Sequence, residues 1–285
     1  MNEADFIAAL RSLPLHPGAR GLADDAAVIE IGGETLVLTH DVMAEGTHFR
    51  ADANLRDVAW KLVASNLSDL AAKGADPVGV LLGYALGAGD AEFVGGFRAA
   101  LDEFGVPLLG GDTYSGEGPR TFGLTAIGKA TCTPVPARSG ASSGDALYVT
   151  GTLGRAMLGF EGEGEHLDAF NRPNPRLYEG RALAPIVTAM LDVSDGLLLD
   201  VFRMAEASGV TIAIDSDAVP VADAGRRDEC LRWGDDYELL FTLPEGADCP
   251  VDAARIGHVE QRGFAPLMLD DHPLVNAKGL GYQHR

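Results

Sequence analysis

The chain has 285 residues, of which 46% are hydrophobic and 22% are charged, so it can bury a core and is not a disordered tail. A formal net charge of -20 disfavours binding to nucleic acid or to an anionic membrane, and it favours binding of divalent cations. The three cysteines are widely spaced, which gives no support to a disulfide framework or a zinc site. An acidic N-terminal segment and the lack of a long apolar run predict a cytoplasmic protein.

Helix and strand signals alternate from the start of the chain. A short helix is expected over residues 3–13, and two β-rich runs joined by Gly32 and Gly33 predict a hairpin. Asn54 is expected to cap a helix that runs to about Lys73.

The alternation continues to residue 130. The run "VGVLLGYAL" predicts a buried strand, and Asp90 begins a helix that ends near Gly105. "VPLLGGDT" predicts a short strand leading into a turn, and "TFGLTAIGKA" predicts a further strand. Residues 131–145 are rich in Pro, Ser and Gly and are expected to join two domains.

The second half has a similar pattern. Strands are expected at "ALYVTG", "VTIAID", "DYELLFTLP" and "RIGHVE", and helices around 152–160 and 176–189. The stretch "MLDVSDGLLLD" at residues 190–200 reads as strand, turn and helix. Alternating elements in both halves predict an α/β or α+β protein of two domains.

Aspartates recur at the predicted strand ends. Each stretch alone has a structural explanation, because "GGD" can form a turn and Ser194 or Asp195 can cap the following helix. Several carboxylates brought together with few basic residues would instead need cations, and such oxygen ligands favour Mg²⁺ or Ca²⁺. The sequence leaves both alternatives open. The strand-end residues are Asp24, Asp25, Asp41, Asp112, Asp192 and Asp195, and Asp69 lies within the predicted helix.

One nucleotide-binding motif is excluded. "GLTAIGKA" matches G-x-x-x-x-G-K but ends in Ala where a phosphate-binding loop needs Ser or Thr, and it leads into the proline-rich segment rather than a helix. We find no Ser-His-Asp or Cys-His set for covalent catalysis.

Seven motifs occur in one order: "LADDAAV", "LTHDVMAEGTHF", "SNLSDLAAKGADP", "LLGGDT", "ARSGASSGDALYVTG", "AMLDVSDGLLLD" and "WGDDYELLFT". Together they resemble the thiamine-monophosphate kinase family, within the aminoimidazole-ribonucleotide synthetase-like superfamily of ATP-binding enzymes. The resemblance covers about residues 3–245, with a weak match at "GLGYQHR".

The resemblance implies an α/β (α+β) fold of two domains. Residues 1–133 would form an N-terminal domain whose mixed sheet pairs across a homodimer, and residues 134–285 a C-terminal α/β domain. The implied reaction is Mg²⁺-dependent transfer of the γ-phosphoryl group of ATP to thiamine monophosphate, which gives thiamine diphosphate and ADP without a covalent intermediate. Several Mg²⁺ ions are implied in each site.

Carried over by position, the resemblance assigns three sets of residues. The metal ligands would be Asp24, Thr39, His40, Asp41, Asp69, Asp112, Asp192 and Asp195. The ATP contacts would be Gly111, Asp112, Arg138 and Ser194. The thiamine-phosphate contacts would be His48, Asp235 and Tyr282.

Some positions depart from the family pattern. His40 stands where the family usually has Thr or Ser, so a metal contact there requires its backbone carbonyl. Asp235 replaces a Glu, and the ending around Tyr282 differs. The alternatives are a surface or core role for His48 and a cap of the following strand by Asp235 and Asp236. The alternative functions of the whole chain are those of another ATP-dependent enzyme of the superfamily or of a non-catalytic Mg–nucleotide-binding module.

Overall fold

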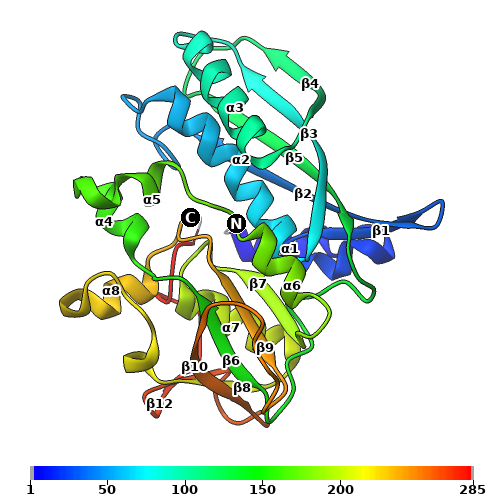
Figure 1. The fold of residues 1–285 in the computed structure, drawn as a ribbon, viewed down its shortest axis with the longest axis vertical. Helices are drawn as coiled ribbons and strands as arrows, with labels where there is room; N and C mark the ends of the chain where they lie inside the picture. The colour runs from blue at the N-terminus through cyan, green and yellow to red at the C-terminus, as the bar shows by residue number, and fades with distance from the viewer. Residues whose placement is uncertain (1–2, 284–285) are drawn as a thin grey trace.

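The computed structural model describes residues 3–283 and contains two mixed β-sheets that follow one another along the chain. Figure 1 shows the first sheet in the upper half of the molecule and the second in the lower half. Residues 131–145 connect them without helix or strand. The mixed α/β character predicted from the sequence is confirmed, and the domain boundary after residue 133 stays a prediction.

The first sheet has five strands in the order β1-β2-β5-β3-β4. β3 and β4 pair in parallel, and the other neighbours are antiparallel. Gly32 and Gly33 form the β1–β2 turn with φ angles of 63° and 87°, which confirms the predicted hairpin. The strands are β1 (Ala27–Ile31), β2 (Glu34–Ala44), β3 (Ala75–Ala85), β4 (Leu108–Tyr114) and β5 (Thr121–Ala130).

Helices α2 (Leu55–Ala72) and α3 (Asp90–Phe104) cover one face of this sheet (Figure 1). The Asn54 side chain accepts a hydrogen bond from the N–H of Arg56 at 3.0 Å, so the predicted cap of α2 is confirmed. The N-terminal helix α1 (Glu3–Leu10) is shorter than predicted and is followed by the 3₁₀ helix η1 (Pro17–Leu22).

The other face of the first sheet is exposed. Val42 on β2 and Leu81 on β3 are 44% and 38% exposed, so β3 is not the buried strand that its apolar run predicted. β4 is exposed along its whole length at the edge of the sheet. It continues as a strand through Gly111 and Asp112, where a turn was predicted.

The second sheet has seven strands in the order β12-β11-β8-β10-β6-β9-β7, and α7 packs against it. Pro185 ends the helix predicted over 176–189 early, because proline cannot continue a helix. The strands are β6 (Ala146–Thr150), β7 (Ala189–Asp192), β8 (Thr211–Ile214), β9 (Leu239–Leu243), β10 (Ala253–Glu260), β11 (Leu267–Leu269) and β12 (His272–Leu274). The α-helices are α4 (Arg155–Glu161), α5 (Leu167–Asn171), α6 (Leu177–Leu183), α7 (Leu197–Ser208) and α8 (Arg227–Arg232), and the 3₁₀ helices are η2 (Gly164–His166), η3 (Ser216–Ala218) and η4 (Ala224–Arg226).

Helix α2 joins the two halves. Its first part packs on the first sheet, whereas Ala71 and Ala72 share an apolar cluster with Leu183 of α6 and Met190 of β7. The polar residues of α2 therefore lie at the junction of the two sheets. Within residues 3–283, no helix combines the length and hydropathy needed to cross a membrane. The three cysteines are free thiols.

Candidate functional site

The buried polar side of α2 connects the two sheets. The hydroxyl of Thr39 on β2 donates a hydrogen bond to Asp69 of α2. The preceding residue of α2, Ser68, donates from Oγ to Oδ2 of Asp192, the last residue of β7, at 2.5 Å. Asp69 and Asp192 are thereby brought together, as the convergence hypothesis required.

Asp41 joins this group from the middle of β2, not from a strand end as predicted. Its backbone N–H donates to Oδ1 of Asn66 on α2 at 3.1 Å. Thr39 and Asp41 are two residues apart on a strand and therefore point to the same, helix-covered face. We refer to Asp41, Asp69 and Asp192 as the acidic triplet.

The acidic triplet forms no ion pair with Lys or Arg in the chain from residue 3 to residue 283. Burial raises the pKa of Asp69 well above its usual range, and the neighbouring charges of Asp41 and Asp192 raise it further. Burial likewise raises the pKa of Asp192 well above its usual range and, to a lesser degree, that of Asp41. Three carboxylates held together without a basic partner need positive charge from elsewhere.

Asp24 and Asp25, directly before β1, have basic partners instead. Lys73 Nζ lies 2.5 Å from Oδ1 of Asp24 and 2.7 Å from Oδ2 of Asp25. Arg20 Nη1 donates to Oδ2 of Asp24 at 2.5 Å, and the Arg138 guanidinium donates to Asp25. Burial alone would raise the pKa of Asp25, but Lys73 and Arg138 hold it below its usual range. This Asp24–Asp25 pair is therefore neutralised within the chain.

Asp195 lies in the turn between β7 and α7, and Arg203 Nη1 donates to its Oδ2 at 2.5 Å. No side chain caps α7, so the capping alternative for Ser194 and Asp195 is not what the structure shows. Instead, the N–H of Asp195 donates to Oδ2 of Asp200 at 3.1 Å. The N–H of Tyr282 donates to the carbonyl of Asp195 at 2.9 Å, which brings the C-terminal segment to this turn.

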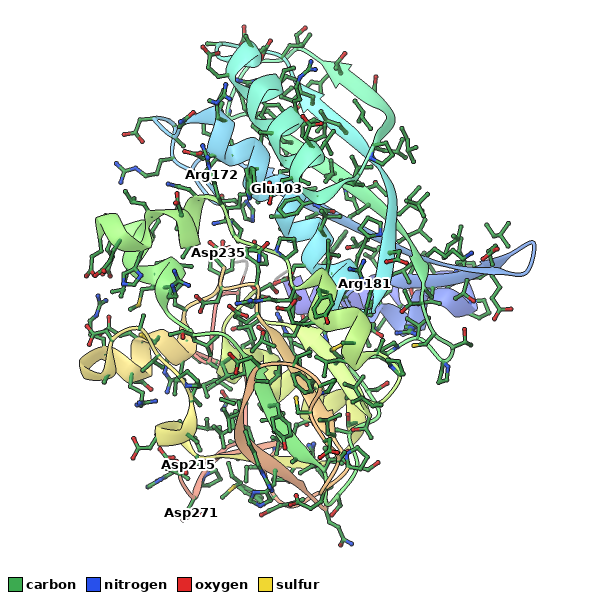
Figure 2. The ribbon with its side chains drawn as sticks, viewed as in Figure 1. Glu103, Arg172, Arg181, Asp215, Asp235 and Asp271 are labelled. Atoms are coloured by element: carbon green, nitrogen blue, oxygen red, sulfur yellow. The ribbon has the colours of Figure 1, made fainter. Side chains whose placement is uncertain are left out.

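A second group of predicted residues lies beside a cavity that has both aromatic and polar walls. Figure 2 shows Asp235 between the two halves of the molecule, far from Asp215 and Asp271 at the end of the second. Lys61 Nζ of α2 lies 2.7 Å from Oδ2 of Asp235 and 3.7 Å from the centre of the Phe170 ring. Lys61, His48 and Phe170 line a cavity of about 270 Å³. The cavity combines aromatic walls with a buried cation.

Asp236, the neighbour of Asp235, does not cap the strand that follows it, which was the alternative role considered for it. Asp236 accepts hydrogen bonds from the N–H groups of Gly154 and Ala156, at 2.8 and 3.3 Å, and so caps the start of α4 rather than the following strand. Burial raises the pKa of Asp236 to about 8, although these two bonds oppose the shift.

His40 is on the wrong face of β2 for a side-chain contact with the acidic triplet. Its Nδ1 lies 2.9 Å from the hydroxyl of Thr125 on the exposed face, whereas Thr39 faces α2. Only the backbone of His40 is available to the acidic site.

Asp112 and Gly111 are also distant from the triplet within one chain. Asp41 of β2 pairs with Leu124 of β5, Leu124 with Leu82 of β3, and Leu82 with Gly111 of β4. Three strand spacings of about 4.8 Å each place Gly111 about 14 Å from Asp41. Asp112 therefore cannot share one cation with Asp41 of the same chain.

Arg138 occupies the other side of the acidic site. Its backbone N–H donates to Oδ1 of Asp24 at 3.2 Å, and its Nε is buried without a hydrogen-bond partner in the described part of the chain. A cavity of about 420 Å³ nearby is lined by Arg20, Asp24 and Ser139. A guanidinium N–H without a partner is suited to an anionic ligand, and the residues on either side of Arg138, Ala137 and Ser139, line this cavity.

The donor set of the acidic triplet suits Mg²⁺. The donors are carboxylate oxygens and the hydroxyl of Thr39, which are the ligands that hard divalent cations prefer. A divalent cation would also supply the positive charge that the triplet lacks. The residues present therefore fit the predicted group.

Several residues of the site were not predicted. Lys73, Lys61 and Arg203 contact the predicted site residues Asp24, Asp235 and Asp195 directly. One sequence signal was available for Lys73, because a lysine at the end of an apolar helix ("LAAKG") must either reach solvent or find a buried anion.

Comparisons with known proteins identify the family of the chain. The profile of the AIR synthase related protein N-terminal domain matches residues 23–130, and that of the C-terminal domain matches residues 142–265. Thiamine-monophosphate kinase of Salmonella typhimurium is 38% identical over 255 residues, which cover 79% of this chain and 76% of that protein.

Solved structures match over nearly the whole chain. The structure of AaThiL complexed with AMPPCP and TMP has a TM-score of 0.86 and 26% identity, covering 100% of this chain and 97% of that one. Thiamine-monophosphate kinase from Stenotrophomonas maltophilia K279a has a TM-score of 0.77 and 33% identity, covering 95% and 96%. The chain belongs to the thiamine-monophosphate kinase family of AIR synthase related proteins.

Proposed function

We propose that this chain transfers the γ-phosphoryl group of ATP to thiamine monophosphate, which gives thiamine diphosphate and ADP. Family membership supports this reaction, and so does the AaThiL structure with its ATP analogue and TMP. The observation in this chain that carries the proposal is the acidic triplet, which is buried at the junction of the two sheets without a basic partner in residues 3–283.

The chemistry requires no general base from the protein. The acceptor is a phosphate monoester whose second pKa is about 6, so it is already an anionic nucleophile at pH 7. When bound, Mg²⁺ would neutralise and orient the phosphate oxygens of the two polyanions. The task of the protein is then to position the two substrates and to hold the cations.

The metal ligands in this proposal are the acidic triplet, Thr39 and Asp195, together with the backbone carbonyl of His40. Thr39 is already held by its hydrogen bond to Asp69, and Asp195 by Arg203, so these oxygens have fixed positions before any ligand binds.

The ATP phosphates are proposed to lie against Arg138 and Ser194. Arg138 offers a buried Nε without a partner in the described part of the chain, and its sequence neighbours Ala137 and Ser139 line the cavity of about 420 Å³. Ser194 lies in the turn directly after β7. Strand ends of this kind are where α/β folds place ligand-binding loops.

Thiamine monophosphate is proposed to occupy the cavity lined by His48 and Lys61. Its aromatic wall suits the rings of thiamine, and Lys61 is placed to hold Asp235 in position. Tyr282, which is 45% exposed and bonded through its N–H to Asp195, is proposed to cover the phosphate end.

We also propose that the chain forms a homodimer through the exposed edge strand β4. β4 leaves its backbone edge unpaired within residues 3–283 and exposes Leu108, Leu109 and Tyr114 by 50%, 52% and 53%. Because Asp112 cannot reach the Asp41 of its own chain, we propose that Gly111 and Asp112 serve the site of the second copy.

The proposed reaction is tested by incubating the protein with ATP, Mg²⁺ and thiamine monophosphate and measuring thiamine diphosphate by chromatography. We expect product that depends on Mg²⁺, and unphosphorylated thiamine should be a poor acceptor because it lacks the anionic nucleophile. Phosphorylation of thiamine but not of its monophosphate would contradict the proposal. Binding of Mg–ATP without turnover would indicate a nucleotide-binding module instead.

A further inference from the structure

Lys73 is a buried cation inside the acidic site. Its side chain is fully buried at the end of α2, and its ammonium contacts Oδ1 of Asp24 at 2.5 Å, Oδ2 of Asp25 at 2.7 Å and the carbonyl of Met190 at 3.2 Å. An ammonium group has three N–H donors, and these three oxygens can accept all of them. Lys73 is therefore held in one position and has no route to solvent.

The position of Lys73 follows from the helix that carries it. Asp69 and Lys73 are four residues apart, so they project from the same side of α2 toward the junction of the two sheets. The helix thus carries a carboxylate of the acidic triplet and, one turn later, a fixed positive charge.

The carboxylates beside Lys73 have their oxygens occupied. Oδ2 of Asp24 accepts from Arg20, and its Oδ1 accepts from Lys73 and from the N–H groups of Asp25 and Arg138. Asp25 accepts from Lys73 on Oδ2 and from Arg138 on Oδ1. A metal ion at this pair would have to displace basic groups that are themselves buried or half-buried.

The acidic triplet offers the opposite environment. Thr39 and Ser68 donate neutral hydroxyl hydrogen bonds to Asp69 and Asp192, and no Lys or Arg within residues 3–283 forms an ion pair with these acids. A divalent cation gains full attraction at the triplet, whereas it meets the like charges of Lys73, Arg20 and Arg138 at the Asp24–Asp25 pair.

We infer that Lys73 takes the place of a divalent cation at the Asp24–Asp25 pair and confines the bound divalent cations to the acidic triplet. Asp24, a metal ligand by family resemblance, then has a lysine as its cation in this chain. The inference rests on the proposed function, because it concerns the cations of the same site. It assigns Lys73 the role of a positioning residue.

Counting bound Mn²⁺ by equilibrium dialysis in the presence of AMPPCP tests this inference. We compare the full-length wild type with Lys73→Met, which keeps the apolar stem and removes the charge, and with Lys129→Met as the control. Lys129 is an exposed lysine that pairs with Glu34 on the hairpin strand, so its loss changes the net charge equally. We expect one additional Mn²⁺ per chain in Lys73→Met and the wild-type number in Lys129→Met.

An unchanged count in folded Lys73→Met overturns the inference. Should Lys73→Met fail to fold, Asp24→Asn in the wild-type background decides: an unchanged Mn²⁺ count supports the inference, and the loss of one ion overturns it. If the wild type binds no Mn²⁺ with AMPPCP, the proposed function fails. If it binds Mn²⁺ but these variants contradict the expectation, only the inference fails.

Discussion

The two ends of the acidic site solve the same electrostatic problem in different ways. At the Asp24–Asp25 pair, Lys73, Arg20 and Arg138 supply positive charge from the chain, and the pKa of Asp25 is lowered. At the acidic triplet, hydroxyl and amide groups are the neighbours, and burial raises the pKa values. Buried acids with built-in partners are already neutralised, and removing one partner is costly, whereas buried acids without partners are available to a cationic ligand.

The largest expected effect is on turnover. Asp41→Asn and Asp69→Asn should each lower the rate of thiamine diphosphate formation by about 10²-fold or more, because each removes a carboxylate that would hold the Mg²⁺ ions that neutralise the transferring phosphoryl group. Both variants should remain folded, since each relieves repulsion within the triplet. Asp102→Asn on the exposed side of α3 is the matched control. Near-wild-type turnover in either triplet variant would remove its assignment as a ligand.

Mixed dimers test whether a second chain completes the site. If Asp112 serves the partner's triplet, a co-expressed mixture of Asp41→Asn and Asp112→Asn chains contains dimers with one intact site. Random assembly should then give about a quarter of wild-type activity, while each variant alone is nearly inactive. If the mixture is as inactive as the separate variants, both residues act within one chain.

The melting temperature of the protein tests whether the acidic triplet binds cations. Mg²⁺ with ATP should raise the melting temperature more than either alone, because the phosphate oxygens complete the coordination of cations held by the acids. Asp192→Asn should weaken this gain while leaving the metal-free melting temperature equal or higher. A strong decrease in the metal-free melting temperature would instead show that Asp192 is a structural residue, held by Ser68.

The smallest expected effect is on the pH dependence of the free energy of unfolding, to which Asp69 and Asp25 should contribute in opposite directions. It is measured in metal-free protein, with a chelator present. The raised folded-state pKa of Asp69 means that the unfolded chain releases its proton first, so stability from this group falls as the pH rises above about 4. The lowered folded-state pKa of Asp25 contributes stability that is complete above about pH 4 and lost as the pH falls through the folded value.

Two variants separate these contributions. Asp69→Asn should stabilise the metal-free protein more at pH 8 than at pH 5, whereas Asp25→Asn should destabilise it to a similar extent at both. Equal stabilisation by Asp69→Asn at the two pH values would contradict the raised pKa.

Local signals in the sequence were sufficient for much of the fold. The cap at Asn54, the turn at Gly32 and Gly33, and the strand, turn and helix around Asp192 were all predicted from neighbouring residues. The "GGDT" segment was mispredicted as a turn because glycine usually signals one. Here Gly111 is required for close approach to β3, since a Cβ would lie 1.9 Å from the carbonyl oxygen of Leu82.

The site was less accessible to sequence reasoning because its partners are far apart in the chain. Local spacing placed Asp69 on a helix with Ser65 and Asn66, and the structure confirms that placement. Local spacing could not show that Lys73 and Asp25, which are 48 residues apart, form an ion pair. It also could not show that Asp112 lies three strands away from Asp41.

The most direct test of the difference between the two ends is a crystal structure of the protein with Mn²⁺ and AMPPCP, in which anomalous scattering locates the metal ions. The account predicts peaks within coordination distance of Asp41, Asp69 and Asp192, and none between Asp24 and Asp25, where Lys73 should remain. A peak at the Asp24–Asp25 pair, or none at the triplet, would contradict it.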